Sequence, residues 1–159
     1  MKKIAFACFI ILLVSCKSGK TVSITAKNSD KTDFIKMNLS EISTTQKNRA
    51  YTLGKRVLMT CNTSSFKPFT TDEATDEVLQ NINKDKISKT CQNILQVFGQ
   101  FKDLQLVEVL RFEGNQTTVF RYKCDYEKKY KIKELQVSIN DENKITAITT
   151  KDWKDAYIP

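Results

Sequence analysis

The spacing of apolar residues changes at Gly99, and this change limits the folds open to the chain more than any other feature. Before Gly99, apolar side chains recur every three or four residues, which predicts amphipathic helices. After Gly99 they alternate with polar residues, which is typical of strands with one buried face. Helices followed by a run of strands predict an α+β domain, because βαβ units would alternate the two.

Three segments before Gly99 are predicted to be helices. Thr70 and Glu73 have the spacing of a capping box and are expected to begin the second helix, and residues 83–85 separate it from the third. A glycine inside a helix costs about 1 kcal/mol relative to alanine, so Gly54 suggests a close approach of the first helix to a sheet. The apolar stripes are, in chain order, Ala50, Leu53, Gly54, Val57, Leu58 and Cys61; Ala74, Val78, Leu79 and Ile82; and Ile87, Cys91, Ile94, Leu95 and Phe98.

Four segments after Gly99 are predicted to be antiparallel strands. Gly114 and Asn115 signal a tight hairpin, and Asn143 can adopt the positive φ that the last turn needs. The predicted architecture is α+β, with three N-terminal helices packed on a curved antiparallel sheet of about four strands. The strands are 104–112, 117–126, 135–139 and 145–150, and in the second of them Phe120, Tyr122, Cys124 and Tyr126 share the apolar face opposite Arg121, Lys123 and Asp125.

The first sixteen residues have the pattern of an export signal. Lys2 and Lys3 precede an apolar run, 4–14, that is too short to cross a hydrocarbon core of about 30 Å. The sequence Leu-Val-Ser-Cys that ends at Cys16 resembles the lipobox of bacterial lipoproteins. This resemblance implies cleavage before Cys16, a thioether-linked lipid on its sulfur and acylation of the new amino terminus. A secretory peptide with an incidental Cys16 is the alternative.

These patterns divide the chain into three parts. Residues 1–15 are the expected lipoprotein signal peptide, 16–33 the lipidated cysteine with a polar tether, and 34–159 a single domain. Lys17 stands where an Asp would resemble an inner-membrane retention signal. We therefore expect an outer-membrane lipoprotein that faces the periplasm, with the membrane as a partner through the lipid.

The residue types present exclude several kinds of chemistry. The chain contains 0 histidines, which removes the commonest general base, the commonest zinc ligand and every Ser-His or Cys-His pair. The formal net charge is +8, but the lysines are dispersed rather than interleaved with aromatic residues, so no nucleic-acid partner is expected. The lysines form a solvated face or attract anionic lipid headgroups or envelope polymers. No cofactor and no metal are expected.

Three cysteines follow Cys16, and the sequence leaves their state open. Export to an oxidising compartment permits a disulfide between Cys61 and Cys91, with Cys124 as the odd thiol. Such a bridge would stabilise the domain by about 3–4 kcal/mol in the chain-entropy model. The alternative is three buried free thiols, because free cysteine commonly behaves as a small apolar residue.

Residues 45–150 resemble the nuclear transport factor 2-like superfamily, also called cystatin-like, which includes ketosteroid isomerase and many small lipoproteins. The resemblance is carried by the helix end and linker 94–102, the strand 118–122 and the strand-turn-strand 137–148. It implies a cone-shaped fold with a pocket between a curved sheet and the helices. Phe120, Tyr122 and Tyr126 would line that pocket, with the two hydroxyls available as hydrogen-bond donors. The alternative is that these three residues are aromatic side chains of the hydrophobic core and line no pocket.

Three functions remain open. The first is a non-catalytic envelope lipoprotein that binds a small apolar ligand or a protein partner. The second is a periplasmic inhibitor or immunity protein that acts through an exposed loop, 62–69 or 127–130. The third is an isomerase- or dehydratase-like enzyme, which would need a buried carboxylate within hydrogen-bond reach of a tyrosine.

Overall fold

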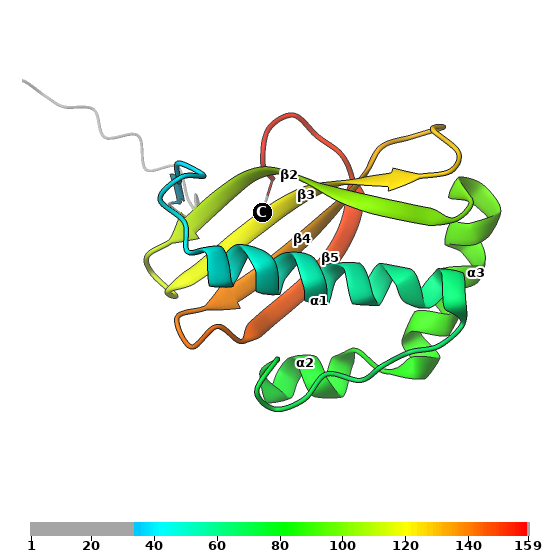
Figure 1. The fold of residues 1–159 in the computed structure, drawn as a ribbon, viewed down its shortest axis with the longest axis horizontal. Coiled ribbons are helices and arrows are strands. Elements are labelled where there is room, and N and C mark those ends of the chain that lie inside the picture. The colour runs from blue at the N-terminus through cyan, green and yellow to red at the C-terminus, as the bar shows by residue number, and fades with distance from the viewer. Residues whose placement is uncertain (1–33, 159) are drawn as a thin grey trace, which may run out of the picture. The chain divides into compact units, whose positions relative to one another are not determined.

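The computed structural model of the chain describes residues 34–158. Three helices lie between a short first strand and four longer ones (Figure 1). The expected signal peptide, Cys16 and the tether lie outside the described residues. The elements are β1 (Ile35–Lys36), α1 (Thr44–Thr63), α2 (Asp76–Asn81), α3 (Lys84–Phe98), β2 (Phe101–Phe112), β3 (Thr117–Tyr126), β4 (Lys133–Asn140) and β5 (Ile145–Asp152).

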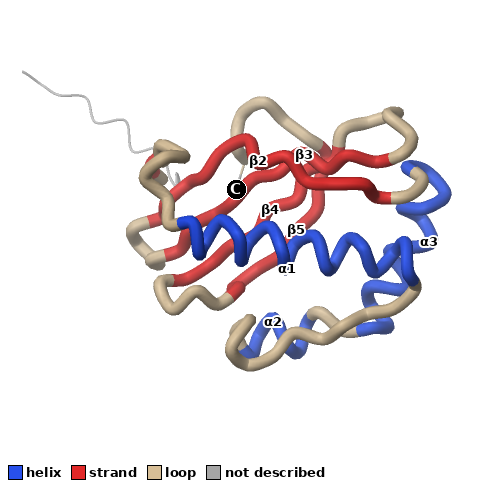
Figure 2. Tube along the Cα trace, viewed as in Figure 1, coloured by secondary structure: helices blue, strands red, loops and turns tan. Residues whose placement is uncertain are grey.

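The strands form one antiparallel sheet in the order β1-β2-β3-β4-β5 (Figure 2). The α+β class and the antiparallel sheet agree with the expectation from the sequence. The expectation of about four strands, all after the helices, was wrong, because β1 precedes α1 and pairs Ile35 with Arg111. Two residues are too few to show an alternating pattern, so this strand left no signal in the sequence.

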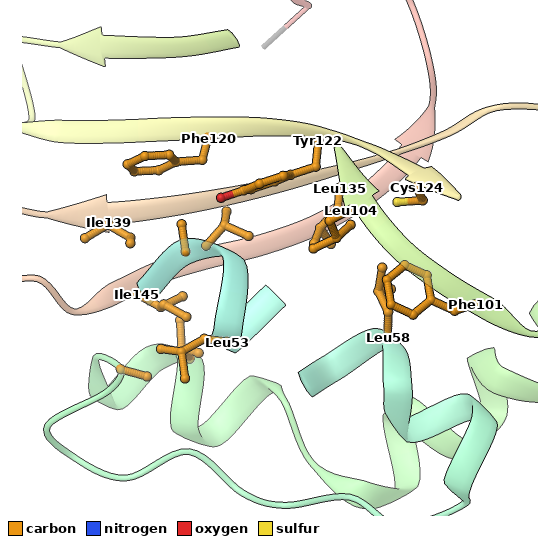
Figure 3. Packing of buried hydrophobic residues seen from close by; sticks show 14 of the residues in the cluster. Leu53, Leu58, Phe101, Leu104, Phe120, Tyr122, Cys124, Leu135, Ile139 and Ile145 are labelled. Atoms are coloured by element: carbon orange, nitrogen blue, oxygen red, sulfur yellow. The ribbon is translucent and has the colours of Figure 1, made fainter. Parts of the chain in front are cut away.

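Helix α1 lies across one face of the sheet, which we call the inner face, and contacts β2 and β4 (Figure 1). A Cβ atom at Gly54 would lie 2.8 Å from Cδ2 of Leu135 and 3.0 Å from Cγ2 of Val137. The close approach expected from this glycine is therefore confirmed. The core between α1 and the sheet is largely apolar around this contact (Figure 3), and its labelled members include Leu53, Leu58, Phe120, Leu135, Ile139 and Ile145.

The helix stripes were predicted correctly except for two residues and two helix starts. Ile87 and Leu95 are only partly buried and lie outside the core cluster. Helix α2 begins at Asp76 rather than at the predicted capping box. The carboxylate of Glu73 does accept a hydrogen bond from the Thr70 amide at 3.1 Å, but the backbone on either side of Ala74 bonds to Ile145 of β5 instead of continuing into a helix.

Helix α3 begins earlier than its apolar stripe, because Asn83 caps it. The Asn83 side chain accepts a hydrogen bond from the Lys86 amide at 3.1 Å. This satisfies one of the amide groups that a helix start leaves without a partner. Residues 83–85, expected as a break between helices, are therefore the start of α3.

The two hairpin turns differ in how well the sequence predicted them. Asn143 has a φ of 61°, as expected for the turn before β5. In the turn before β3 the positive φ, 52°, falls on Gln116 rather than on Gly114 or Asn115. Within residues 34–158, none of the helices has the length and hydrophobicity that crossing a bilayer requires.

Candidate functional site

An apolar groove of about 190 Å³ opens between α1, α3 and β5. Its polar rim includes Lys86, whose ammonium donates a long hydrogen bond of 3.4 Å to Asn81. All but one of the aliphatic side chains in the groove are partly exposed to solvent, although Val57, Ile82, Ile94 and Ile148 also pack against the core. The aliphatic residues of the groove are Val57, Leu58, Ile82, Ile87, Ile94 and Ile148, of which only Leu58 is fully buried.

A disulfide holds two walls of this groove together. Cys61 of α1 is bonded to Cys91 of α3, with their Cα atoms 4.8 Å apart. Cys61 itself lines the groove. Of the two alternatives that the sequence left open, the structure therefore has the bridge, and Cys124 carries a free, buried thiol. Burial raises the pKa of this thiol to about 12, so Cys124 is protonated and unreactive at neutral pH.

Of the three aromatic residues expected to line a pocket, Phe120 and Tyr122 lie in the core, fully buried on the inner face (Figure 3). Tyr126 packs between Phe98 and Phe101 and is buried as well, but it also lines a separate hollow of about 430 Å³. Because every side chain of the groove comes from other positions, the predicted pocket residues and the observed groove do not coincide. The alternative interpretation, that these residues are core aromatics, fits the positions of Phe120 and Tyr122.

The Tyr122 hydroxyl is buried and has no hydrogen-bond partner among the described residues. Burial raises the pKa of Tyr122 above its ordinary value, so the hydroxyl stays protonated. An unpaired buried hydroxyl costs about 1–3 kcal/mol. It faces the helices from the inner face and would serve as a neutral donor, but no described carboxylate faces it.

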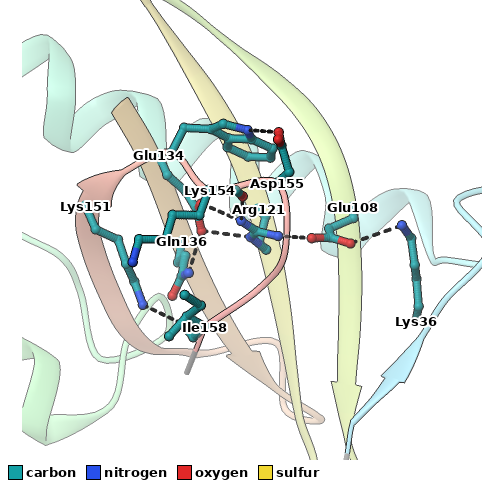
Figure 4. Close-up of polar contacts among 10 residues, drawn as sticks. Lys36, Glu108, Arg121, Glu134, Gln136, Lys151, Lys154, Asp155 and Ile158 are labelled. Carbon is teal, nitrogen blue, oxygen red and sulfur yellow. Dashed lines mark hydrogen bonds and ion pairs between the residues drawn. The ribbon is translucent and has the colours of Figure 1, made fainter. Parts of the chain in front are cut away.

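The buried carboxylates lie on the opposite, outer face of the sheet (Figure 4). Arg121 of β3 donates from Nε to Glu134 at 2.8 Å and from Nη2 to the same carboxylate at 2.6 Å. It also bonds to Glu108 of β2, and its Nη2 donates to the backbone carbonyl of Lys154 at 2.9 Å. Arg121 and Glu134 are each only 1% exposed. Because successive residues of a strand point to opposite faces, Tyr122 cannot meet this cluster.

The C-terminal segment covers this cluster. The guanidinium of Arg121 lies 4.7 Å from the ring centre of Trp153 and 5.5 Å from that of Tyr157. Burial raises the pKa of Glu134, but the hydrogen bonds from Arg121 and Gln136 outweigh it and hold this pKa below its usual range. With nearly all its donors engaged, Arg121 fastens β2, β4 and the C-terminal segment to β3. The residues in contact here are Arg121, Glu108, Glu134, Gln136, Trp153 and Tyr157. We call them the Arg121 cluster.

The sequence did not indicate the Arg121 cluster. The alternation placed Arg121, Lys123 and Asp125 on the face of β3 opposite the apolar one, but it did not indicate that Arg121 is buried there. Its partners Glu108 and Glu134 each lie 13 residues away, and the covering backbone of Lys154 lies 33 residues away. A weak signal was available in the two aromatic residues near the C-terminus, Trp153 and Tyr157, which are unusual in an otherwise polar segment.

The two loops considered for partner binding differ in exposure. Loop 62–69 ends at Phe69, which is buried beneath Arg56 at 5.0 Å. Loop 127–130 carries Tyr130, which is 81% exposed. The second loop therefore presents the more exposed aromatic side chain, since Phe66 in the first loop is only partly exposed.

The chain matches no family model, no curated protein and no solved structure. Within residues 34–158, no three residues of the Cys, Asp and Glu types come together in a way that could hold a metal ion. The site must therefore be interpreted from its own geometry.

Proposed function

We propose that this chain is a non-catalytic lipoprotein of the cell envelope, anchored to the outer membrane through Cys16, whose periplasmic domain binds a small apolar ligand. The groove between α1, α3 and β5 is the observation that carries this proposal. Each buried methylene contributes about 0.8 kcal/mol, so aliphatic walls open to solvent favour an apolar occupant.

The size of the groove narrows the ligand class. Pockets for drug-sized ligands have volumes of about 300–1,000 Å³. The groove, at about 190 Å³, is smaller and suits a short alkyl chain better than a fused-ring molecule. The Cys61–Cys91 bridge keeps α1 and α3 at a constant spacing, which reduces the reorganisation that binding would otherwise require.

We assign the domain to the nuclear transport factor 2-like, cystatin-like class as part of the same proposal. Support comes from α1 lying across one face of an antiparallel sheet, and from the groove at the junction of helices and sheet. The isomerase-like alternative has no comparable support, because Tyr122 and the buried glutamates 108 and 134 lie on opposite faces of β3.

A second candidate, a periplasmic inhibitor or immunity protein, is favoured by one observation, the exposed ring of Tyr130 in loop 127–130. An inhibitor of this type would present the loop to an enzyme. Native mass spectrometry of the protein purified from its own envelope separates the candidates. A retained small molecule supports the apolar-ligand proposal, whereas a stoichiometric co-purified enzyme supports the inhibitor.

A direct test of the groove uses the neutral, environment-sensitive probe N-phenyl-1-naphthylamine. Ile94→Trp should fill the groove and weaken probe binding at least tenfold. Val97→Trp is the matched control, because Val97 lies on the same helix, is exposed and does not line the groove. Equal binding by the two variants, with unchanged circular dichroism, would remove the groove as the site.

The anchor is tested separately. Cys16→Ser should abolish incorporation of labelled fatty acid and release the protein from the membrane fraction. A variant that still incorporates the label would show that Cys16 is not the lipid attachment site.

A further inference from the structure

The hairpin between β3 and β4 combines exposed apolar and positively charged side chains in five residues, 128–132, which we call the basic hairpin. Tyr130 is 81% exposed and Ile132 is 49% exposed. Lys128, Lys129 and Lys131 alternate with them, and the segment contains no acidic residue. Figure 1 shows the loop projecting beyond the body of the sheet, beside α3.

The hairpin lysines are held by weak contacts. Lys128 donates to the carbonyl of Gln96 at 3.1 Å, and Lys129 lies 3.4 Å from the carboxylate of Asp125 on an exposed surface. Lys131 pairs with Asp152, again at the surface. Exposed ion pairs of this kind contribute little to stability, so the ammonium groups can exchange these partners for other anions at small cost.

A hollow of about 430 Å³ lies beside the basic hairpin. Lys123, Lys128, Lys129 and Lys131 line it, together with Ile132, and two carboxylates, Asp103 and Asp125, share its wall. Asp103 is already engaged by the Tyr51 hydroxyl at 2.5 Å and by Lys55 at 2.9 Å. The four lysines exceed the two carboxylates, so the hollow favours an anionic group.

We propose that the basic hairpin is a second membrane contact, in which Tyr130 and Ile132 enter the interface of an anionic bilayer while the lysines around the hollow bind lipid phosphates. This inference rests on the membrane-anchored placement in the proposed function. Tyrosine rings sit at the headgroup level of bilayers, and lysine stems bury their methylenes while the ammonium stays in water.

The position of the basic hairpin is compatible with the anchor. It lies at the end of the sheet where β2 begins, and β1 pairs near the other end of β2. The 12 residues of β2 span about 40 Å. The 17 residues between Cys16 and Phe34 can reach at most about 60 Å when fully extended, so lipid and basic hairpin can touch the same bilayer. A lipid combined with a basic patch is a recognised two-signal arrangement for stable attachment.

The test uses the chain expected after cleavage, residues 16–159, with Cys16→Ser, which removes both the apolar signal segment and the expected lipid site, and flotation with vesicles. Vesicles of phosphatidylethanolamine with 30% phosphatidylglycerol should bind the protein, and binding should weaken as NaCl rises because salt screens the lysines. Neutral phosphatidylcholine vesicles should bind at least tenfold less. Equal binding to both vesicle types would overturn the proposal.

Two matched pairs of variants assign the contact to the basic hairpin. Ile132→Ser should weaken binding at least threefold, whereas Ile158→Ser, which changes a residue 48% exposed, should not. Replacing Lys128, Lys129 and Lys131 with Gln should weaken binding at least tenfold. Replacing the exposed Lys67, Lys84 and Lys89 with Gln removes the same charge elsewhere and should have little effect.

Two outcomes would contradict the membrane contact. Unchanged vesicle binding by the hairpin variants would overturn it. Retained vesicle binding with loss of a co-purified acidic protein would assign the basic hairpin to that protein instead. Neither outcome touches the groove or the anchor, which are tested by probe binding and by lipid labelling.

Discussion

The two faces of the sheet are buried by different chemistry, although both are carried by the same strand β3. On the inner face, Phe120 and Tyr122 pack beneath α1 in an apolar core. On the outer face, Arg121 lies among two glutamates and is covered by a short C-terminal segment with Trp153. The C-terminal segment also packs Tyr157 on a small apolar cluster of Leu110, Phe112 and Val119, so the outer face combines buried ion pairs with apolar contacts.

The two faces also differ in how much stability a substitution is expected to cost. The inner face loses only packing when a side chain is shortened. When Arg121 is lost, the outer face leaves the buried Glu134 without its ion-pair partner, whereas Glu108 keeps a contact of 3.1 Å to the exposed Lys36. An uncompensated buried charge is more costly than a cavity of similar size. The inner face contains one unpaired group, the Tyr122 hydroxyl, whereas the Arg121 cluster satisfies nearly all of its donors.

The largest effect is expected from Arg121→Met. Removing the guanidinium leaves Glu134 buried without its ion-pair partner and leaves Glu108 with Lys36 alone, which should lower the free energy of unfolding by about 3–5 kcal/mol. Urea denaturation measures it. Arg111→Met is the control, because Arg111 pairs with the exposed Asp141 and should cost about 1 kcal/mol or less. Similar losses in the two variants would contradict the importance of burial.

On the inner face, Leu58→Ala should cost about 2–5 kcal/mol, because it opens a cavity under α1. Leu95→Ala is the matched change at a partly exposed position outside the core cluster, and it should cost clearly less. Thermal or urea unfolding gives both values. If Leu95→Ala proves as costly as Leu58→Ala, then α3 buries a different face from the one described.

The disulfide joins two helices of the helical layer, α1 and α3. Replacing Cys61 and Cys91 with Ala should lower the free energy of unfolding by about 2–4 kcal/mol, because the unfolded chain gains the freedom of the opened loop. Thiol labelling checks the pairing. Unreduced protein in denaturant should label at Cys124 but not at Cys61 or Cys91, and native protein at pH 8 should leave all three unlabelled because Cys124 is buried.

The smallest expected effect is on the pH dependence of stability, and it distinguishes the charged outer face of the sheet from the apolar inner face. The pKa of Glu134 is lower in the folded protein than its ordinary value of 4.5. Its contribution to stability is therefore present above about pH 4.5 and is lost as the pH falls through the folded pKa. Glu134→Gln should flatten the acid limb of the curve of unfolding free energy against pH, whereas Leu58→Ala should shift the whole curve without changing its slope. An unchanged acid limb in Glu134→Gln would show that other carboxylates dominate it.

Local patterns predicted much of the inner layer. The helical stripes placed Leu53, Leu58 and Phe98 in the core, and the glycine in α1 predicted a close contact with the sheet, which the structure places at β4. These predictions succeeded because burial on one side of a helix or strand leaves a period in the sequence. The groove was not predicted residue by residue, since it forms where three elements meet and leave a space.

The sequence by itself determined the class of the fold, the inner face of β3, and the expectation of an export signal ending at Cys16. The tertiary structure decided the presence of the additional strand β1, the start of α2, the Cys61–Cys91 bridge and the burial of Arg121. The physical reason is the distance along the chain between interacting residues. The periodicity of apolar residues shows which side of a helix or strand is buried, whereas these four features depend on partners that come from distant parts of the chain.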